Sequence, residues 1–245
     1  MVIMVLKRGN HVETTQPQKS KKGASLAQRI NIMRASVMGA NDGILSVAGI
    51  VIGVAGATNS PRAIFLAGIA GMLAGTISMA MGEWVSVSTQ RDSEKRAIQR
   101  ETSAVDNHVD TEIDFIKDKY MAQGISEQLS NRAAHEMMSG DPLYTGVRER
   151  YGFDPKVKTS AIGAAIASMI SFPTGSILPL VAITFFPARI RVLATVISVI
   201  IALSITGYIA ASLGHANRGK ATMRNVISGL LTMAVTYAIG LLFAH

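Results

Sequence analysis

One acidic residue interrupts a long apolar stretch near the start of the chain. Asp42 lies inside the apolar residues 35–58. Residues 44–58 alone would form a helix of about 22 Å, which is too short to cross a bilayer, so we expect Asp42 to lie within a membrane-spanning helix. A carboxylate at this depth is costly unless it faces a cation, a partner group or water. Asp42 is therefore a candidate cation or proton site, and the alternative is a hydrogen-bonded structural carboxylate.

A methionine and a glutamate stand four residues apart in the next apolar stretch, residues 62–87. Met79 and Glu83 would share one face of a helix, and Met79 would lie at about the depth expected for Asp42. Carboxylates alone suit Mg²⁺ or Ca²⁺, whereas a thioether beside them favours a softer ion such as Fe²⁺. Met79 could instead be one of many packing methionines, and Glu83 an interfacial side chain that reaches water.

The elements that would position these residues are membrane-spanning helices. Five apolar stretches reach the roughly 20 residues that a bilayer requires; they are residues 35–58, 62–87, 159–186, 192–213 and 223–244. The sequence Asn59-Ser60-Pro61 predicts a tight turn, so the first two form a helical hairpin. Two glycine pairs with small-xxx-small spacing favour close helix contact in this hairpin or in a dimer; they are Gly39 with Gly43 and Gly71 with Gly75.

Composition and charge agree with an all-α membrane protein. Hydrophobic residues make up 49% of the 245 residues, and the chain has no cysteine, which excludes a disulfide scaffold and a cysteine zinc site. The net charge of +8 comes from tails and loops beside apolar runs, a pattern that orients membrane helices and is not that of a nucleic-acid binder. We therefore expect a lipid bilayer, and no nucleic acid, as partner.

The basic residues predict the orientation of the five helices. With a cytoplasmic N-terminus, the inside segments carry 21 Lys and Arg residues and the outside segments carry three. The positive-inside rule then places the C-terminus outside. Residues 1–34 are expected to form a basic, mostly disordered cytoplasmic tail, residues 35–90 the hairpin, and residues 159–245 the last three spans.

Residues 91–158 are polar and predict a small cytoplasmic helical insert between the second and third spans. They hold 13 acidic and 11 basic residues. Residues 88–103 should continue the second span, and new helices should start at Thr111, Ser126 and Asp141. Glu94 and Glu101, seven residues apart, would share a face of that continuation and could collect divalent cations at its cytoplasmic side. The alternative is an ordinary solvated face.

Three sequence blocks resemble the vacuolar iron transporter family, and more narrowly its bacterial branch. The blocks are MGANDG at 38–43, AGTISMAMGEWVSVS at 74–88 and QRDSE at 90–94. The resemblance covers about residues 30–245, including the five-span layout and the insert. It implies a homodimer in a bacterial cell membrane that exports Fe²⁺, and often Mn²⁺, in exchange for protons. It implies neither an enzyme nor a resident cofactor.

The resemblance also assigns roles to individual residues. Asp42 matches the family's metal and proton carboxylate, Met79 its metal-ligand methionine, and Glu101 a glutamate of its cytoplasmic metal-binding domain. On this basis Fe²⁺ would pass Glu83 and bind near Asp42 and Met79, and protonation of Asp42 would release it, because a protonated carboxyl is a poor ligand.

Some positions depart from the family pattern. Gly71 stands where eukaryotic members have a second-span glutamate. In the insert, Ala104 and Phe115 occupy liganding positions, Asp118 replaces another ligand, and Arg150 stands where a late glutamate is expected. These departures predict a degenerate metal-binding domain. The alternatives for function are a transporter of another divalent cation, and a non-transporting membrane scaffold or metal sensor.

Overall fold

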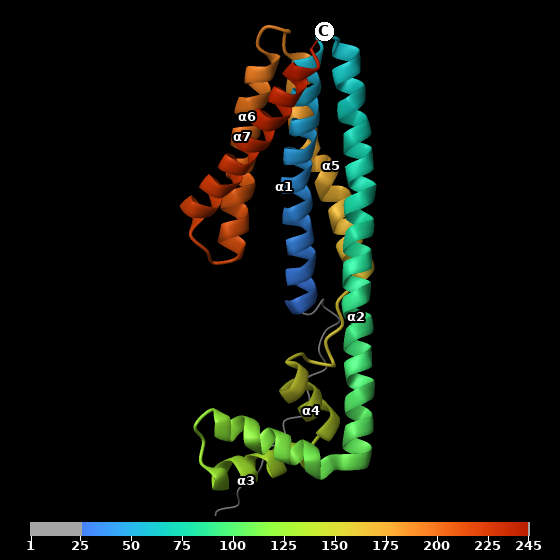
Figure 1. Ribbon diagram of the computed structural model, residues 1–245, viewed down its shortest axis with the longest axis vertical. Coiled ribbons are helices and arrows are strands. Elements are labelled where there is room, and N and C mark those ends of the chain that lie inside the picture. Colours follow the sequence, from blue (N-terminus) through green and yellow to red (C-terminus); the bar gives the residue numbers. More distant parts are fainter. Residues whose placement is uncertain (1–25, 245) are drawn as a thin grey trace, which may run out of the picture.

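The computed structural model of the protein describes residues 26–244, and that part of the chain consists of helices and their connecting loops. Figure 1 shows their arrangement. In chain order the helices are α1 (Leu26–Ala57), α2 (Pro61–Ala122), α3 (Glu127–Met138), α4 (Pro142–Tyr151), α5 (Ala161–Phe185), α6 (Arg191–Leu213) and α7 (Arg218–Leu242). Helices α1, α2, α5, α6 and α7 are long and apolar enough to cross a membrane, which confirms the predicted all-α membrane protein.

Helix α1 is the centre of the membrane bundle. It contacts α2, α5, α6 and α7, and α5 also packs along α2. Buried residues of α1, among them Ile44, Val47 and Val51, form the main core together with Phe172 of α5 and Leu203 of α6. Helices α2 and α7 lie at the outside of the bundle, where most of their apolar side chains are exposed. The residues of α1 are therefore surrounded by four other helices.

Glycines allow α1 and α5 to touch backbone to backbone. A Cβ atom on Gly43 would collide with the carbonyl oxygen of Phe172, and one on Gly175 would collide with that of Ala40. We expected Gly39 and Gly43 to tighten the hairpin or a dimer, but both face α5 instead. The expectation was wrong because small residues favour close approach without selecting which helix approaches.

Helix α2 leaves the membrane bundle and carries the insert. The predicted second span and its polar continuation form one helix that runs to Ala122. The backbone bends at His108, which has non-helical angles (φ −146°, ψ 49°), and the last part of α2 turns sideways (Figure 1). We predicted that a new helix starts at Thr111, and this prediction was wrong. Thr111 lies within α2, just after the kink.

The insert is a small helical unit built on the end of α2. Helices α3 and α4 begin after Ser126 and Asp141, as predicted, and Asp141 Oδ1 accepts the backbone N–H of Tyr144 at 3.0 Å. A separate small core forms around Ile116, Ala134 and Met138. The insert lies at the same end of the molecule as the start of α1, and the chain ends at the opposite end (Figure 1).

The first membrane-spanning helix begins earlier in the sequence than we predicted. Helix α1 begins at Leu26, so residues 26–34 are helical and not part of a disordered tail. Leu26, Ile30 and Met33 continue the apolar periodicity of the span, which explains the longer helix. The rest of the predicted tail, residues 1–25, lies outside the described residues.

Candidate functional site

A hollow of about 640 Å³ lies between α1 and α2, with Phe172 of α5 in its wall. Asp42, Met79 and Glu83, the three membrane residues selected from the sequence, all line this hollow. Two carboxylates and a thioether sulfur thus face one space that is otherwise bordered by apolar helices. We call this space the α1–α2 hollow.

The lining residues follow a regular spacing on both helices. On α1 they recur every four positions, at Met38, Asp42, Ser46 and Ile50, and on α2 the same spacing connects Gly71, Gly75, Met79 and Glu83. Residues four apart share one helix face, so each helix presents one continuous stripe to the other. The glycines of α2 have no side chains, and this leaves the space that the hollow occupies.

A polar network fixes the direction in which Asp42 points. Asp42 Oδ1 accepts a hydrogen bond from the Ser46 hydroxyl at 3.0 Å, one turn further along α1. The neighbouring Asn41 faces the other side, where its Oδ1 accepts from Asn225 of α7 at 3.0 Å and from Thr206 of α6 at 3.4 Å. These hydrogen bonds fix the orientation of α1 about its own axis. In this orientation Asp42 faces α2.

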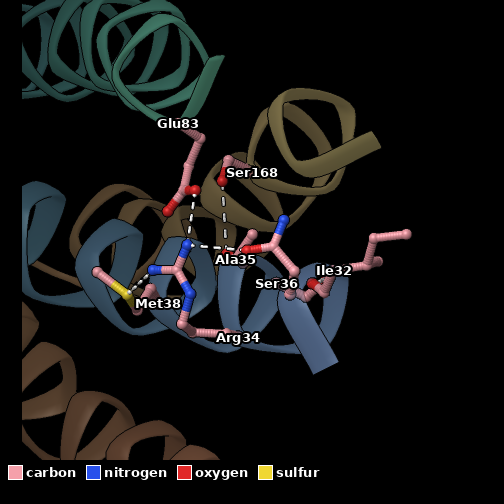
Figure 2. Close-up of polar contacts among 8 residues, drawn as sticks. Ile32, Arg34, Ala35, Ser36, Met38, Glu83 and Ser168 are labelled. Atoms are coloured by element: carbon pink, nitrogen blue, oxygen red, sulfur yellow. Dashed lines mark hydrogen bonds and ion pairs between the residues drawn. The ribbon is translucent and has the colours of Figure 1, made fainter. Parts of the chain in front are cut away.

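Glu83 forms an ion pair with an arginine that we did not select from the sequence. The Glu83 side chain is only 7% exposed, and its Oε2 accepts from Arg34 Nη2 at 3.0 Å. The same guanidinium group also donates to the Met38 sulfur at 3.3 Å (Figure 2), and to Asn31 Oδ1 at 3.2 Å. Arg34 extends the four-residue spacing of α1 by one step, which is the signal that could have identified it.

The same region anchors α1 to α5. Ser168 of α5 donates to the backbone carbonyl of Ala35 at 3.5 Å, next to the ion pair of Arg34 and Glu83 (Figure 2). Ala35 is fully buried in a small cluster with Val87 of α2. The end of the hollow that carries Glu83 is therefore held by contacts among three helices.

The acidic residues predicted to bind metal in the insert do not come together. Glu94 accepts a hydrogen bond from Gln90 of its own helix at 2.9 Å, Asp118 is exposed, and Glu101 is buried. Among residues 26–244, no three His, Asp or Glu side chains lie close enough to hold a metal ion.

Glu101 instead belongs to a buried ion cluster with Glu112 and Arg150. Arg150 Nη2 donates to Glu112 Oε2 at 2.6 Å, and Arg150 Nε lies 3.5 Å from Glu101 Oε2. Burial, and next the charge of Glu112, raise the pKa of Glu101 to about 7, although Arg150 lowers it. This cluster lies outside the membrane-spanning part of α2, about 20 Å beyond residue 87.

Comparison with known proteins agrees with this architecture. The model of the VIT family matches residues 33–241. The chain is 31% identical to the vacuolar iron transporter of Acanthamoeba castellanii, over 86% of this chain and 78% of that protein. It is 32% identical to vacuolar iron transporter homolog 2.1 of Arabidopsis thaliana, over 93% and 88% of the two chains. These relatives carry the names of transporters and not of enzymes, and the match covers the bundle and the insert together. The chain belongs to the VIT family.

Proposed function

We propose that this protein exports Fe²⁺, and also Mn²⁺, from the cytoplasm in exchange for protons. The observation that carries the proposal is the α1–α2 hollow, in which Asp42, Met79 and Glu83 line one space between two apolar helices. The names of the relatives from Acanthamoeba castellanii and Arabidopsis thaliana support iron as the cargo.

The donor atoms favour a borderline-soft divalent ion. Asp42 and Glu83 offer carboxylate oxygens, which bind most divalent cations, and Met79 adds a polarizable sulfur, which shifts the preference away from Mg²⁺ and Ca²⁺. Met38 also lines the hollow, but its sulfur accepts a hydrogen bond from Arg34 at 3.3 Å, which leaves Met79 as the sulfur donor. Fe²⁺ fits this mixed set of oxygen and sulfur donors better than a hard cation does.

One carboxylate can couple the metal to the proton. Asp42 receives a neutral hydroxyl donor from Ser46, so its negative charge remains available to a cation. A protonated Asp42 would lose that charge and would bind metal poorly. Metal and proton therefore exclude each other at Asp42, and this exclusion is the physical basis for exchange.

Of the two carboxylates that line the hollow, Glu83 is the one nearer to the insert. Its counter-ion is Arg34, whose side chain is 46% exposed, so the pair lies between the hollow and the solvent. A cation that uses Glu83 competes with the guanidinium group for the same oxygen. We infer that Arg34 sets how strongly this end of the hollow attracts cations.

The orientation and the assembly form part of the proposal. We place the N-terminus and the insert in the cytoplasm and the C-terminus outside, because the basic residues gather on the insert side. The membrane that we propose, a bacterial cell membrane, rests on the resemblance of the three sequence blocks to the bacterial branch of the family. One protomer supplies two carboxylates to the hollow, and α2 leaves apolar side chains such as Ile77 and Trp84 exposed beside it. A homodimer packed along α2 would cover this face.

Metal flux in proteoliposomes with a sulfur variant tests the choice of cargo. Uptake of Fe²⁺ and Mn²⁺ is measured anaerobically under an imposed proton gradient, with Mg²⁺ or Ca²⁺ as competitor. We expect Met79→Leu to reduce Fe²⁺ flux and to make it more sensitive to Mg²⁺, because the substitution removes the sulfur and keeps the apolar volume. Met223→Leu, at an exposed position of α7, serves as the matched control.

Two results would overturn the proposal. If Met79→Leu leaves both the Fe²⁺ flux and its competition by Mg²⁺ unchanged, the sulfur does not select the cargo. If folded wild-type protein moves neither Fe²⁺ nor Mn²⁺ under a proton gradient, the protein is not an exchanger of these ions, and a sensor or scaffold role takes its place.

A further inference from the structure

The kink in α2 brings two acidic side chains of the same helix together outside the membrane. Glu101 lies before the bend at His108 and Glu112 lies after it, and the two residues are only 1% and 4% exposed. Two buried carboxylates repel each other unless a proton or a cation compensates their charge. This pair therefore needs a positive partner in the folded insert.

Arg150, in the last turn of α4, supplies the positive charge. Its Nη2 and Nε donate to Glu112 Oε2 at 2.6 and 3.2 Å, and Nε lies 3.5 Å from Glu101 Oε2. The guanidinium carbon lies 3.9 Å from the centroid of the Phe115 ring, which adds a cation–π contact. The Arg150 guanidinium group thus lies between the two carboxylates and bridges them.

Glu101 retains capacity to bind a cation. Both of its carboxylate oxygens are buried without a hydrogen-bond donor, and one arginine faces two carboxylates. Helix α4 closes one side, because a Cβ atom on Gly146 would collide with Glu101 Oε1. The Arg150 side chain is 31% exposed, whereas both glutamates are buried, so Arg150 is the part of the cluster that is exposed to solvent.

We propose that Arg150 is a built-in counter-cation that keeps a divalent-cation site in the insert closed. With Arg150 in place, the insert takes up no divalent metal at this cluster and serves as a helical module fixed to α2. Without Arg150, Glu101 and Glu112 bind one divalent cation in its place. The inference concerns the insert alone and does not depend on transport through the α1–α2 hollow.

Mn²⁺ binding to the full-length protein in detergent tests this inference. Free Mn²⁺ is followed by its electron paramagnetic resonance signal at mildly alkaline pH, where Glu101 is ionised. We expect Arg150→Gln to bind one more Mn²⁺ per chain than the wild type, and we expect Glu101→Gln in the same variant to abolish this gain. Arg148→Gln, an exposed arginine in the same turn of α4, should bind like the wild type.

Thermal unfolding of the same samples separates loss of folding from loss of binding. Arg150→Gln should lower the unfolding temperature without metal, because two buried carboxylates lose their counter-ion, and Mn²⁺ should restore it by binding the folded state. A variant that folds only with Mn²⁺ supports the proposal equally.

Three outcomes overturn the proposal. The first is a folded Arg150→Gln that binds no additional Mn²⁺. The second is an Arg150→Gln that remains unfolded with and without Mn²⁺. The third is wild-type Mn²⁺ binding that Glu101→Gln removes, because the site would then be open while Arg150 is present.

Discussion

Arg34 of α1 forms an ion pair with Glu83, the carboxylate that we propose an incoming cation uses. Removing Arg34 leaves the nearly buried carboxylate of Glu83 without its counter-ion. A metal ion that binds there would then neutralise its negative charge. A partly exposed ion pair is worth about 1 kcal/mol, which corresponds to about fivefold in affinity. We predict that Arg34→Gln lowers the half-saturating Fe²⁺ concentration for flux about fivefold.

Two control variants distinguish this change in Fe²⁺ affinity from a general loss of structure. Arg34→Lys keeps a positive charge near Glu83 and should remain close to the wild type. Arg29→Gln removes an exposed arginine of the same helix and should change nothing. A half-saturating concentration that stays the same or rises in Arg34→Gln would show that Arg34 does not compete with the metal.

The sequence predicted a site residue only where that residue differed in type from its neighbours along the chain. A carboxylate or a sulfur inside an apolar helix is visible from local spacing, so Asp42, Met79 and Glu83 were selected and lie together. Arg34 was not selected, and Arg150 was noted only as a departure from the family pattern, because neither arginine is unusual beside its neighbours in the sequence. Their importance comes from partners 49 and 38 positions away, which only the folded chain brings into contact.

At the scale of elements, the arm of α2 beyond its kink and α4 together bury Glu101. The pKa of Glu101 is about 7, compared with 4.5 for an exposed glutamate, first because of burial and then because of Glu112. Between these values the folded protein holds a proton that the unfolded chain has released. The free energy of unfolding should therefore fall as the pH rises from 4.5 to 7, and this contribution should level off above pH 7.

Thermal unfolding as a function of pH measures this contribution. We expect Glu101→Gln to remove most of the decrease that the wild type shows across this window. Glu136→Gln, in an exposed ion pair of α3, should keep the decrease. An equal decrease in Glu101→Gln and in the wild type would mean that Glu101 titrates normally in the folded protein.

The elements themselves were largely predictable, and their junctions were not. Apolar length predicted the spans, and capping residues predicted the starts of α3 and α4. The kink at His108 was missed, because Thr111 resembles a helix cap while the chain remains helical around the bend. The partner helix of Gly39 and Gly43 was missed because spacing alone does not specify tertiary contacts.

At the scale of the whole molecule, one helix connects the two parts that carry acidic clusters. Helix α2 contributes Met79 and Glu83 to the α1–α2 hollow, and it continues outward to Glu101 and Glu112 in the insert. In the hollow an arginine neutralises one of the two carboxylates, whereas in the insert an arginine bridges both. This difference leaves Asp42 as the acidic residue most available to a transported ion.

The most direct measurement of the central claim is proton-driven Fe²⁺ flux by Asp42→Asn in proteoliposomes. Asparagine keeps the size of the side chain and an oxygen that can accept from Ser46, so the fold should be retained, but it carries no charge and does not titrate. Asp106→Asn, at an exposed position of α2, is the matched control. We predict that wild type and Asp106→Asn accumulate Fe²⁺ in response to the proton gradient and that Asp42→Asn does not. Full proton-driven flux by folded Asp42→Asn would contradict the assignment of metal and proton to one carboxylate.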